Sequence, residues 1–173
     1  MSPTCFDLLD GHVVGGHADL LAVREPGREW TYAQLLEEVA AFGGVLRHCG
    51  VSAGDRVAVA LPPGLEAVVA VLACARIGAT HVLGGGTGTV LVTASTEPAA
   101  LAGADAEVVL VRQVPGHEAE LRDGRDYEWD VVMRAGRTDP AGCVEGATVT
   151  PYDDQTRAWL EPLLAGETLD LRT

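Results

Sequence analysis

The chain has 173 residues, the size of one ordinary domain, and 47% of them are hydrophobic, which excludes a disordered polypeptide. Its formal net charge is −13, so its surface repels phosphate backbones and anionic lipid, and neither nucleic acid nor a membrane is expected as a partner. All 12 basic residues are arginine. Chemistry that depends on a lysine of this chain, such as a Schiff base or a phosphate-loop lysine, is therefore excluded.

The N-terminal part predicts a short helix followed by a β-hairpin. The helix is expected over Cys5–Val14, where Asp7 and Asp10 interrupt the apolar residues and no basic leader precedes them, so the segment does not resemble a signal peptide. Two short strands, 20–24 and 28–31, flank a Pro-Gly turn and form the hairpin. With no apolar run long enough to span a bilayer, we expect a cytoplasmic protein.

The next stretch predicts two helices around a buried strand. Thr31 and Gln34 form a T-x-x-Q capping box that starts an amphipathic helix, and Gly50 supplies its left-handed end. The strand is expected at Arg56–Leu61. Residues Leu65–Ile77 follow as a helix that is apolar on nearly all sides and should be sandwiched between layers.

Further strands are expected at Thr80–Leu83, Val90–Thr93 and Glu107–Val111, which predicts an α/β fold with a mainly parallel sheet and helices packed on it. In the last third, short helices are expected at Glu118–Arg122, at Tyr127–Ala135 and in a final segment that buries Trp159. Asp153 or Asp154 caps this final helix. We divide the chain into an α/β domain, 1–112, and a divergent extension, 113–173, that packs on the same domain.

Several segments resemble the AMP-forming acyl-CoA synthetases. The similarity covers W-T-Y-A-Q-L-L-E-E-V-A (30–40), V-S-A-G-D-R-V-A-V-A-L-P (51–62) and P-G-L-E-A-V-V-A-V-L-A-C-A-R-I-G-A-T-H (63–81). The opening C-F-D-L-L-D-G-H-V (5–13) is similar to acetyl- and propionyl-CoA synthetases in particular. The resemblance implies part of the family's N-terminal domain, in a family that forms an acyl-adenylate from ATP and then transfers the acyl group to CoA.

The sequence departs from that family where nucleotide and CoA would bind. The family's phosphate loop is rich in Ser, Thr and Gly and carries a lysine, whereas Thr148–Thr156 has neither glycine nor lysine and contains two adjacent carboxylates. The later nucleotide motifs lie beyond the end of this chain. No basic residue occurs in Ser95–Ala106, where the family has arginines that clamp CoA phosphates. We therefore expect no adenylation by this chain alone and no cofactor.

A second departure is a missing crossover helix. Only Gly84–Thr89 connects two expected strands that the family joins through a helix, and six residues are too few for a parallel crossover. Either the two segments pair as an antiparallel hairpin or one strand is lost. In both cases one face of the sheet is uncovered, which favours a protein partner or a homo-oligomer on that face.

Three functions stay open at this point. The first is an accessory protein without adenylating activity, which binds an acyl-CoA synthetase, a carrier protein or itself. The second is a repurposed enzyme acting on an acyl thioester or a biosynthetic intermediate without ATP. The third is a vestigial ligand-binding module that senses CoA or an acyl-CoA. The candidate catalytic residues of the second are His81, Glu66, Cys74 and Asp154, although no spacing places them in a dyad or triad.

The remaining candidates have simpler interpretations beside the functional ones. Gly84, Gly85 and Gly86 match a CoA-facing loop of the family but also suit a flexible connection over the deleted helix. A metal site is not expected, because neither the dispersed cysteines nor the Asp153–Asp154 pair has further ligands at suitable spacing.

Overall fold

The computed structural model describes residues 3–148 and 153–172, so the middle of the predicted phosphate-loop counterpart, 149–152, lies outside the described residues. A five-stranded sheet with the strand order β4-β3-β5-β6-β7 forms the centre of the fold. Every neighbouring pair in it is parallel, which confirms the α/β prediction. Its strands are β3 (Arg56–Ala60), β4 (Thr80–Leu83), β5 (Val90–Ala94), β6 (Val108–Arg112) and β7 (Asp126–Glu128).

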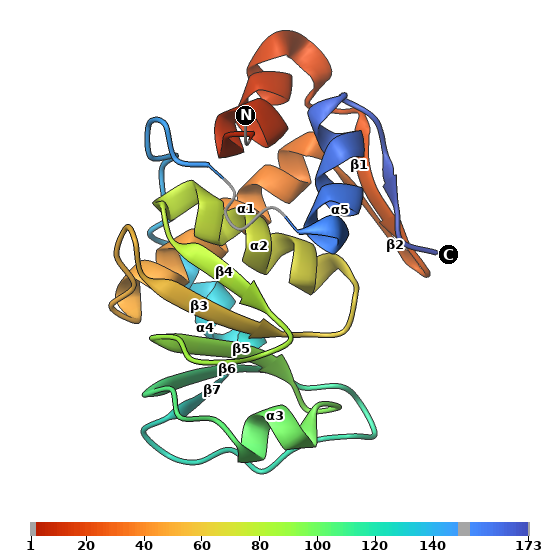
Figure 1. The fold of residues 1–173 in the computed structure, drawn as a ribbon. Coiled ribbons are helices and arrows are strands. Elements are labelled where there is room, and N and C mark those ends of the chain that lie inside the picture. The colour runs from red at the N-terminus through yellow and green to blue at the C-terminus, as the bar shows by residue number, and fades with distance from the viewer. Residues whose placement is uncertain (1–2, 149–152, 173) are drawn as a thin grey trace.

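Helices cover both faces of this sheet. Figure 1 shows the long helices α1 and α2 on one side and the short helix α3 on the other. The main core lies between the sheet, α1 and α2, and α4 packs against α1. The helices are α1 (Tyr32–His48), α2 (Leu65–Ile77), α3 (Pro98–Ala102), α4 (Trp129–Gly136) and α5 (Asp154–Leu164).

Local signals set the ends of the two long helices. The Thr31 side chain accepts a hydrogen bond from the Gln34 backbone while the Gln34 side chain accepts one from the Thr31 backbone, which confirms the capping box. Gly50, just beyond the end of α1, has a φ of 86°, and Gly78 ends α2 with a φ of 77°. The left-handed stop at Gly50 confirms the prediction from the sequence.

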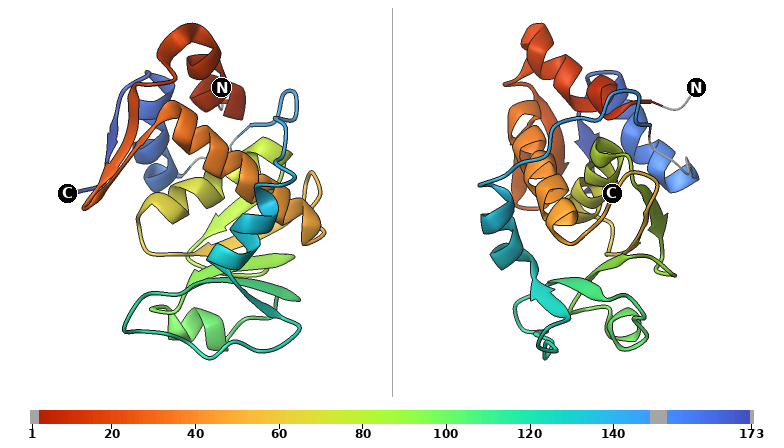
Figure 2. Two further views of the ribbon diagram at one scale, coloured as in Figure 1. Left: turned by 180° about the vertical axis from the view of Figure 1, so that it is seen from behind. Right: turned by 90° about the vertical axis from the view of Figure 1, so that its left-hand side faces the viewer.

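A second, three-stranded sheet lies beside the α1–α2 layer. The predicted hairpin is present as β1 (Leu21–Glu25) and β2 (Arg28–Thr31), and β8 (Leu169–Asp170) adds to β1 in parallel. Figure 2 shows this sheet and α5 on the same side of the molecule as the N-terminal segment. That segment is helical, as predicted, but as two π-helical pieces, η1 (Phe6–Asp10) and η2 (Val13–His17).

The connection from β4 to β5 contradicts both predicted alternatives. The two strands neither form an antiparallel hairpin nor lose a member, because each pairs in parallel with opposite sides of β3. Residues 84–89 cross directly over β3, where a Cβ on Gly88 would lie 2.7 Å from the Arg56 carbonyl oxygen. Extended chain covers ~3.4 Å per residue, so about 20 Å is enough to pass two strand spacings without a helix.

The sheet face that we expected to be uncovered is buried. Ala58, Leu91, Val109 and Val111 form a second apolar cluster there, at most 4% exposed, with Leu101 of α3 packed against it. The crossing loop covers the same face, since a Cβ on Gly85 would contact the Ala60 side chain at 3.8 Å. The expectation of an uncovered face is therefore wrong: the short helix α3, the glycine loop and residues around Leu121 replace the missing crossover helix.

Other predictions in the last third need smaller corrections. The segment 118–122 is not helical, because its backbone bonds to the loop around Gln113, whose amide exchanges hydrogen bonds with Ala119. The helix expected from Tyr127 begins at Trp129, since Asp126–Glu128 joins the sheet edge as β7. The segment 95–106 contains α3, which was not predicted. Of the two candidate caps of the last helix, Asp153 is the N-cap.

Candidate functional site

The carboxyl ends of β3 and β5 border a cavity of about 220 Å³. The chain leaves β3 toward α2 on one face of the sheet and leaves β5 toward α3 on the other. Their ends therefore meet at the point where the connections diverge, which is where open parallel sheets bind ligands. Residues from the hairpin, the Pro62–Gly64 turn, the start of α2 and the segment after β6 line this cavity.

Glu66, in the first turn of α2, is paired with two arginines at this cavity. Arg28 of β2 donates two hydrogen bonds to its carboxylate at 2.8 and 2.9 Å, and Arg112 Nε of β6 donates a third at 3.2 Å. Burial alone would raise the pKa of Glu66, but the guanidinium of Arg28 outweighs it, so that pKa lies below its usual value. The carboxylate is thus held ionised and is a poor proton donor or acceptor.

A second carboxylate at this cavity, that of Glu25, lies at the N-terminus of α2. Its Oε2 accepts a hydrogen bond from the backbone N–H of Leu65 at 3.0 Å, at the N-terminus of α2. Its other carboxylate oxygen pairs with Arg28. Together, the carboxylates of Glu25 and Glu66 accept a hydrogen bond from the N-terminus of α2 and pair with both nearby guanidinium groups. The cavity is therefore an anion-binding arrangement already satisfied by carboxylates of the chain itself.

His81 lies on β4 and is 1% exposed. Its Nε2 is 3.1 Å from the Thr156 hydroxyl, which donates to the Asp153 carboxylate at 3.0 Å. Burial lowers the pKa of His81 despite the nearby Asp153 carboxylate, so its imidazole is neutral near pH 7. This His–Thr–Asp chain ties β4 to the start of α5. His81 is not among the residues that line the cavity at the carboxyl ends of β3 and β5.

The other two catalytic candidates lie elsewhere. Cys74 is fully buried within α2, where burial raises the pKa of its thiol to about 12, and Asp154 is exposed at the start of α5. In residues 3–148 and 153–172, no hydrogen bond or ion pair joins any two of His81, Glu66, Cys74 and Asp154. The structure thus places these four side chains in separate environments rather than in one catalytic centre.

The three candidate cofactor-binding glycines belong to the crossing loop. Gly84, Gly85 and Gly86 have φ values of 78°, 87° and 124°, in the region that favours glycine. Their positions are explained by the passage over β3. Within the described residues, one group of three potential metal donors lies close together, consisting of Cys5, Asp10 and Cys143.

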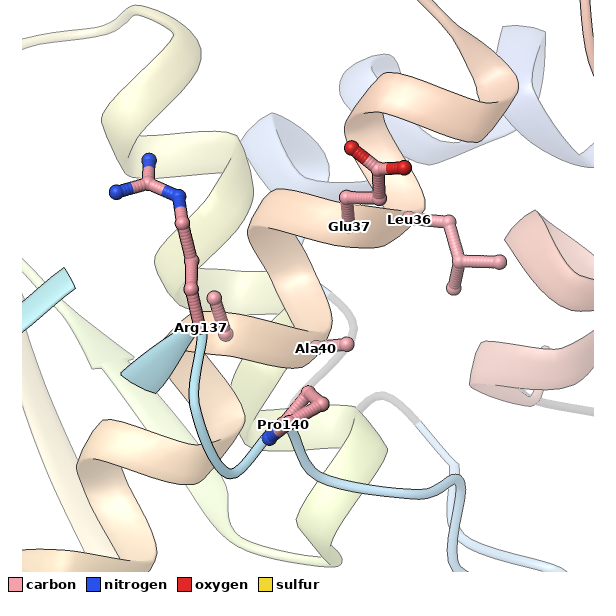
Figure 3. A pocket seen from close by; sticks show the side chains of 6 residues that line it. Leu36, Glu37, Ala40, Arg137 and Pro140 are labelled. Carbon is pink, nitrogen blue, oxygen red and sulfur yellow. The ribbon is translucent and has the colours of Figure 1, made fainter. Parts of the chain in front are cut away.

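Two further hollows, both mainly apolar, lie along α1. One, of about 380 Å³, lies between α1 and the loop after α4; Figure 3 shows Leu36 and Ala40 of α1 with Pro140 nearby, and the Arg137 guanidinium turned away from Pro140. The other, of about 270 Å³, is lined by the following residues from α1, β6, β7 and α4: Val45, His48, Cys49, Val108, Tyr127, Val132, Ala135 and Gly136.

Tyr127, which lines this second hollow, is 43% exposed, and Val131, the residue before Val132 on α4, is 48% exposed. We call the surface formed by Val108, Tyr127, Val131 and Val132 the α4 surface. Exposed apolar side chains grouped around a hollow are typical of contact sites for other molecules.

Comparisons with known proteins identify the family. The sequence profile described as "AMP-binding enzyme" matches residues 12–159. The chain belongs to the AMP-binding enzyme family. Among the members similar to it, an acetyl-coenzyme A synthetase of Streptomyces avermitilis is 39% identical over 72% of this chain and 24% of its own length. One from Mycobacterium bovis is 33% identical over 87% of this chain and 28% of its own length.

Solved structures of the family share the fold. An acyl-CoA synthetase of Brucella canis superimposes with a TM-score of 0.64 at 23% identity, over 81% of this chain and 28% of that one. The coronafacic acid ligase of Pectobacterium brasiliense gives the same TM-score at 14% identity, over 76% of this chain and 29% of that one. The chain thus spans about a quarter of the length of the family members it matches. None of its described helices is long and apolar enough to cross a membrane.

Proposed function

We propose that this member of the AMP-binding enzyme family does not adenylate a substrate on its own and acts as an accessory protein that binds a full-length acyl-CoA synthetase. The observation that carries the binding role is the α4 surface, where Tyr127 lines an apolar hollow of about 270 Å³ and both Tyr127 and Val131 are exposed. Burying such side chains against a partner is favourable by ~25 cal/mol per Å² of apolar area removed from water.

The state of the carboxyl-end cavity supports the absence of adenylation. A bound triphosphate needs cations and free backbone N–H groups. Here Arg28 and Arg112 are paired with Glu66, Glu25 accepts from the first turn of α2, and the chain contains no lysine. A polyphosphate would have to displace two carboxylates in a chain whose net charge is −13.

The strong negative charge also favours a different protein over a second copy as partner. Two chains of net charge −13 repel each other, and that repulsion opposes self-association at low ionic strength. Binding to a carrier protein and self-association of this chain are the alternatives to a complex with a synthetase.

The test measures binding by sedimentation velocity with a full-length acetyl-coenzyme A synthetase, such as the Streptomyces avermitilis relative. Val131→Glu places a charge on the α4 surface, and Leu164→Glu is the matched control, because Leu164 is 44% exposed on α5. We expect a complex with the wild-type chain and with Leu164→Glu, and its loss with Val131→Glu. Equal binding by both variants, or no complex with the wild-type chain, contradicts the proposal.

The proposed lack of adenylating activity is tested separately, by measuring pyrophosphate release from ATP in the presence of acetate or propionate. We expect no release by the purified chain. Sustained release would contradict the proposal even if the α4 surface binds a partner.

A further inference from the structure

Two cysteines that are far apart in the sequence meet beside the C-terminal half of α2. Cys5 precedes η1, and Cys143 lies in the loop after α4. The Cys5 and Cys143 sulfurs and a carboxylate oxygen of Asp10 all lie within 4.8 Å of one another. The loop is held in place by its backbone, since the Val144 N–H donates to the Arg76 carbonyl at 2.8 Å. Both cysteines are free thiols.

A buried arginine fixes the geometry around these thiols. The Arg76 side chain, 8% exposed, donates to both oxygens of Asp10 at 2.8 and 3.1 Å and to the Ala141 carbonyl at 2.6 Å. Its Nη1 also lies 3.8 Å from the Cys5 sulfur. Arg76 therefore connects the N-terminal segment, α2 and the 141–144 loop, and it places a positive charge next to the sulfur pair.

The two thiols differ in access and acidity. Cys5 is fully buried, whereas Cys143 is partly exposed. The Cys5 thiol, as a hydrogen-bond donor, lowers the pKa of Cys143 to about 7; burial and Asp10 oppose this effect, and Arg76 adds to it. The same pairing, together with burial, raises the pKa of Cys5 well above its usual value. An accessible thiolate beside a protonated, buried thiol is the arrangement of an attacking and a resolving cysteine.

A metal ion fits this cluster less well than thiol chemistry does. Both oxygens of Asp10 are already engaged by Arg76, and the guanidinium adds a positive charge where a divalent cation would sit. The cluster then offers two sulfurs and no free carboxylate, which falls short of the four ligands that a zinc site needs.

We propose that Cys5 and Cys143 form a peroxide-oxidisable pair, in which Cys143 is the modification site and Cys5 closes an intramolecular disulfide. The Cys143 thiolate attacks the peroxide oxygen, the O–O bond breaks, and hydroxide or alkoxide leaves, so that Cys143 becomes a sulfenic acid and the peroxide is reduced. The Cys5 sulfur then attacks the Cys143 sulfur, the S–O bond of the sulfenic acid breaks, and the hydroxyl group leaves with the Cys5 proton as water. Disulfide formation requires the two sulfurs, which lie within 4.8 Å of each other, to approach to ~2.05 Å.

The experiment treats the purified full-length chain with a small excess of hydrogen peroxide and maps its cysteines by mass spectrometry. Cleavage after arginine places the four cysteines in four different peptides, 1–24, 48–56, 57–76 and 138–157. We expect one disulfide between the first and the last of these. In Cys5→Ser, dimedone should trap a sulfenic acid on Cys143, and in Cys143→Ser the disulfide should be absent.

Cys49 is the matched control, because it is partly buried and burial raises the pKa of its thiol. Near pH 7, Cys143 should react with iodoacetamide on the order of ten-fold faster than Cys49 in the wild-type chain, which needs no variant to fold. Cys49→Ser should form the disulfide as the wild type does. Equal alkylation of Cys143 and Cys49, no cross-linked peptide pair, or protection of both thiols by stoichiometric Zn²⁺ would overturn the proposal.

Discussion

Arg28 in the hairpin and Glu66 in the first turn of α2 are joined by two parallel hydrogen bonds, of 2.8 and 2.9 Å. The pair connects the small sheet to the carboxyl end of the central sheet, because Arg112 at the end of β6 donates to the same carboxylate. One side chain therefore holds together three elements that are distant in sequence, at the edge where a parallel sheet usually binds its ligand.

Replacing that carboxylate should destabilise the fold. Glu66→Gln removes the carboxylate that Arg28 and Arg112 share. We expect the free energy of unfolding to fall by about 1–2 kcal/mol near pH 7, with the remaining Glu25–Arg28 pair and the partial exposure of Arg28 limiting the loss. Urea denaturation measures this difference. Glu37→Gln, on the exposed side of α1, is the control and should change stability by less than ~0.5 kcal/mol. Equal effects of the two substitutions would remove the structural role assigned to the ion network.

The same pair predicts a pH dependence. The pKa of Glu66 is lower in the folded chain than in the unfolded chain, so its ionised form stabilises the fold above the unfolded value of ~4.3. This contribution is lost as the pH falls through the folded value. The stability difference between the wild type and Glu66→Gln should therefore be constant near neutral pH and shrink below about pH 4. A difference that grows as the solution is acidified would contradict the assigned direction.

Removing the Glu66 carboxylate from Arg28 and Arg112 should also create an anion-binding site. If Glu66 fills the position that an anion would take, pyrophosphate should show no measurable affinity for the wild type and weak affinity, on the order of millimolar, for Glu66→Gln. Isothermal titration calorimetry at low ionic strength makes the comparison, and Glu37→Gln should behave as the wild type. Binding of equal strength by the wild type would mean that the cavity is not blocked by its own carboxylates.

The glycine crossing predicts a steric effect at one position. A Cβ on Gly88 would lie 2.7 Å from the Arg56 oxygen and 2.9 Å from the Ala58 nitrogen, so Gly88→Ala must push the loop away from β3. We expect a loss of about 1–3 kcal/mol in the free energy of unfolding. Gly142→Ala is the control, since nothing lies within 4 Å of a Cβ there and its φ is ordinary. A neutral Gly88→Ala would show that the loop does not rest on β3.

The elements that the sequence predicted well are those with local signals. The capping box at Thr31, the left-handed stop at Gly50 and the Asp153 cap depend on residues within a few positions of one another. The elements that were missed depend on distant partners: β7 exists because it pairs with β6, and β8 because it pairs with β1. Their short sequences carry no periodicity that distinguishes a strand from a loop.

The site was less predictable for the same reason. Glu66 was singled out, but nothing in the spacing of Arg28 and Arg112 links them to it across 38 and 46 residues. The prediction of an uncovered sheet face was wrong because the rule on the length of parallel crossovers assumes a helix in the connection. It does not consider an extended, glycine-rich connection such as 84–89. At Gly85 and Gly88, which carry no side chain, the connection approaches β3 closely enough to cross it.

The burial of His81 predicts a second pH dependence of stability. Since burial lowers its pKa, the folded chain resists protonation of this imidazole, while the unfolded chain binds a proton at a pKa of ~6.5. Its contribution to stability is thus fully present above about pH 6.5 and is lost as the pH falls toward the folded value. An NMR titration of the imidazole signals, with His81 assigned from His81→Gln, should show it titrating below ~6.5.

Thr156→Val removes the hydroxyl that bridges His81 to Asp153, and the free energy of unfolding should fall by about 1–3 kcal/mol. A His81 signal that titrates at or above the usual value, or a Thr156→Val variant as stable as the wild type, would show that this chain of hydrogen bonds does not hold β4 to α5.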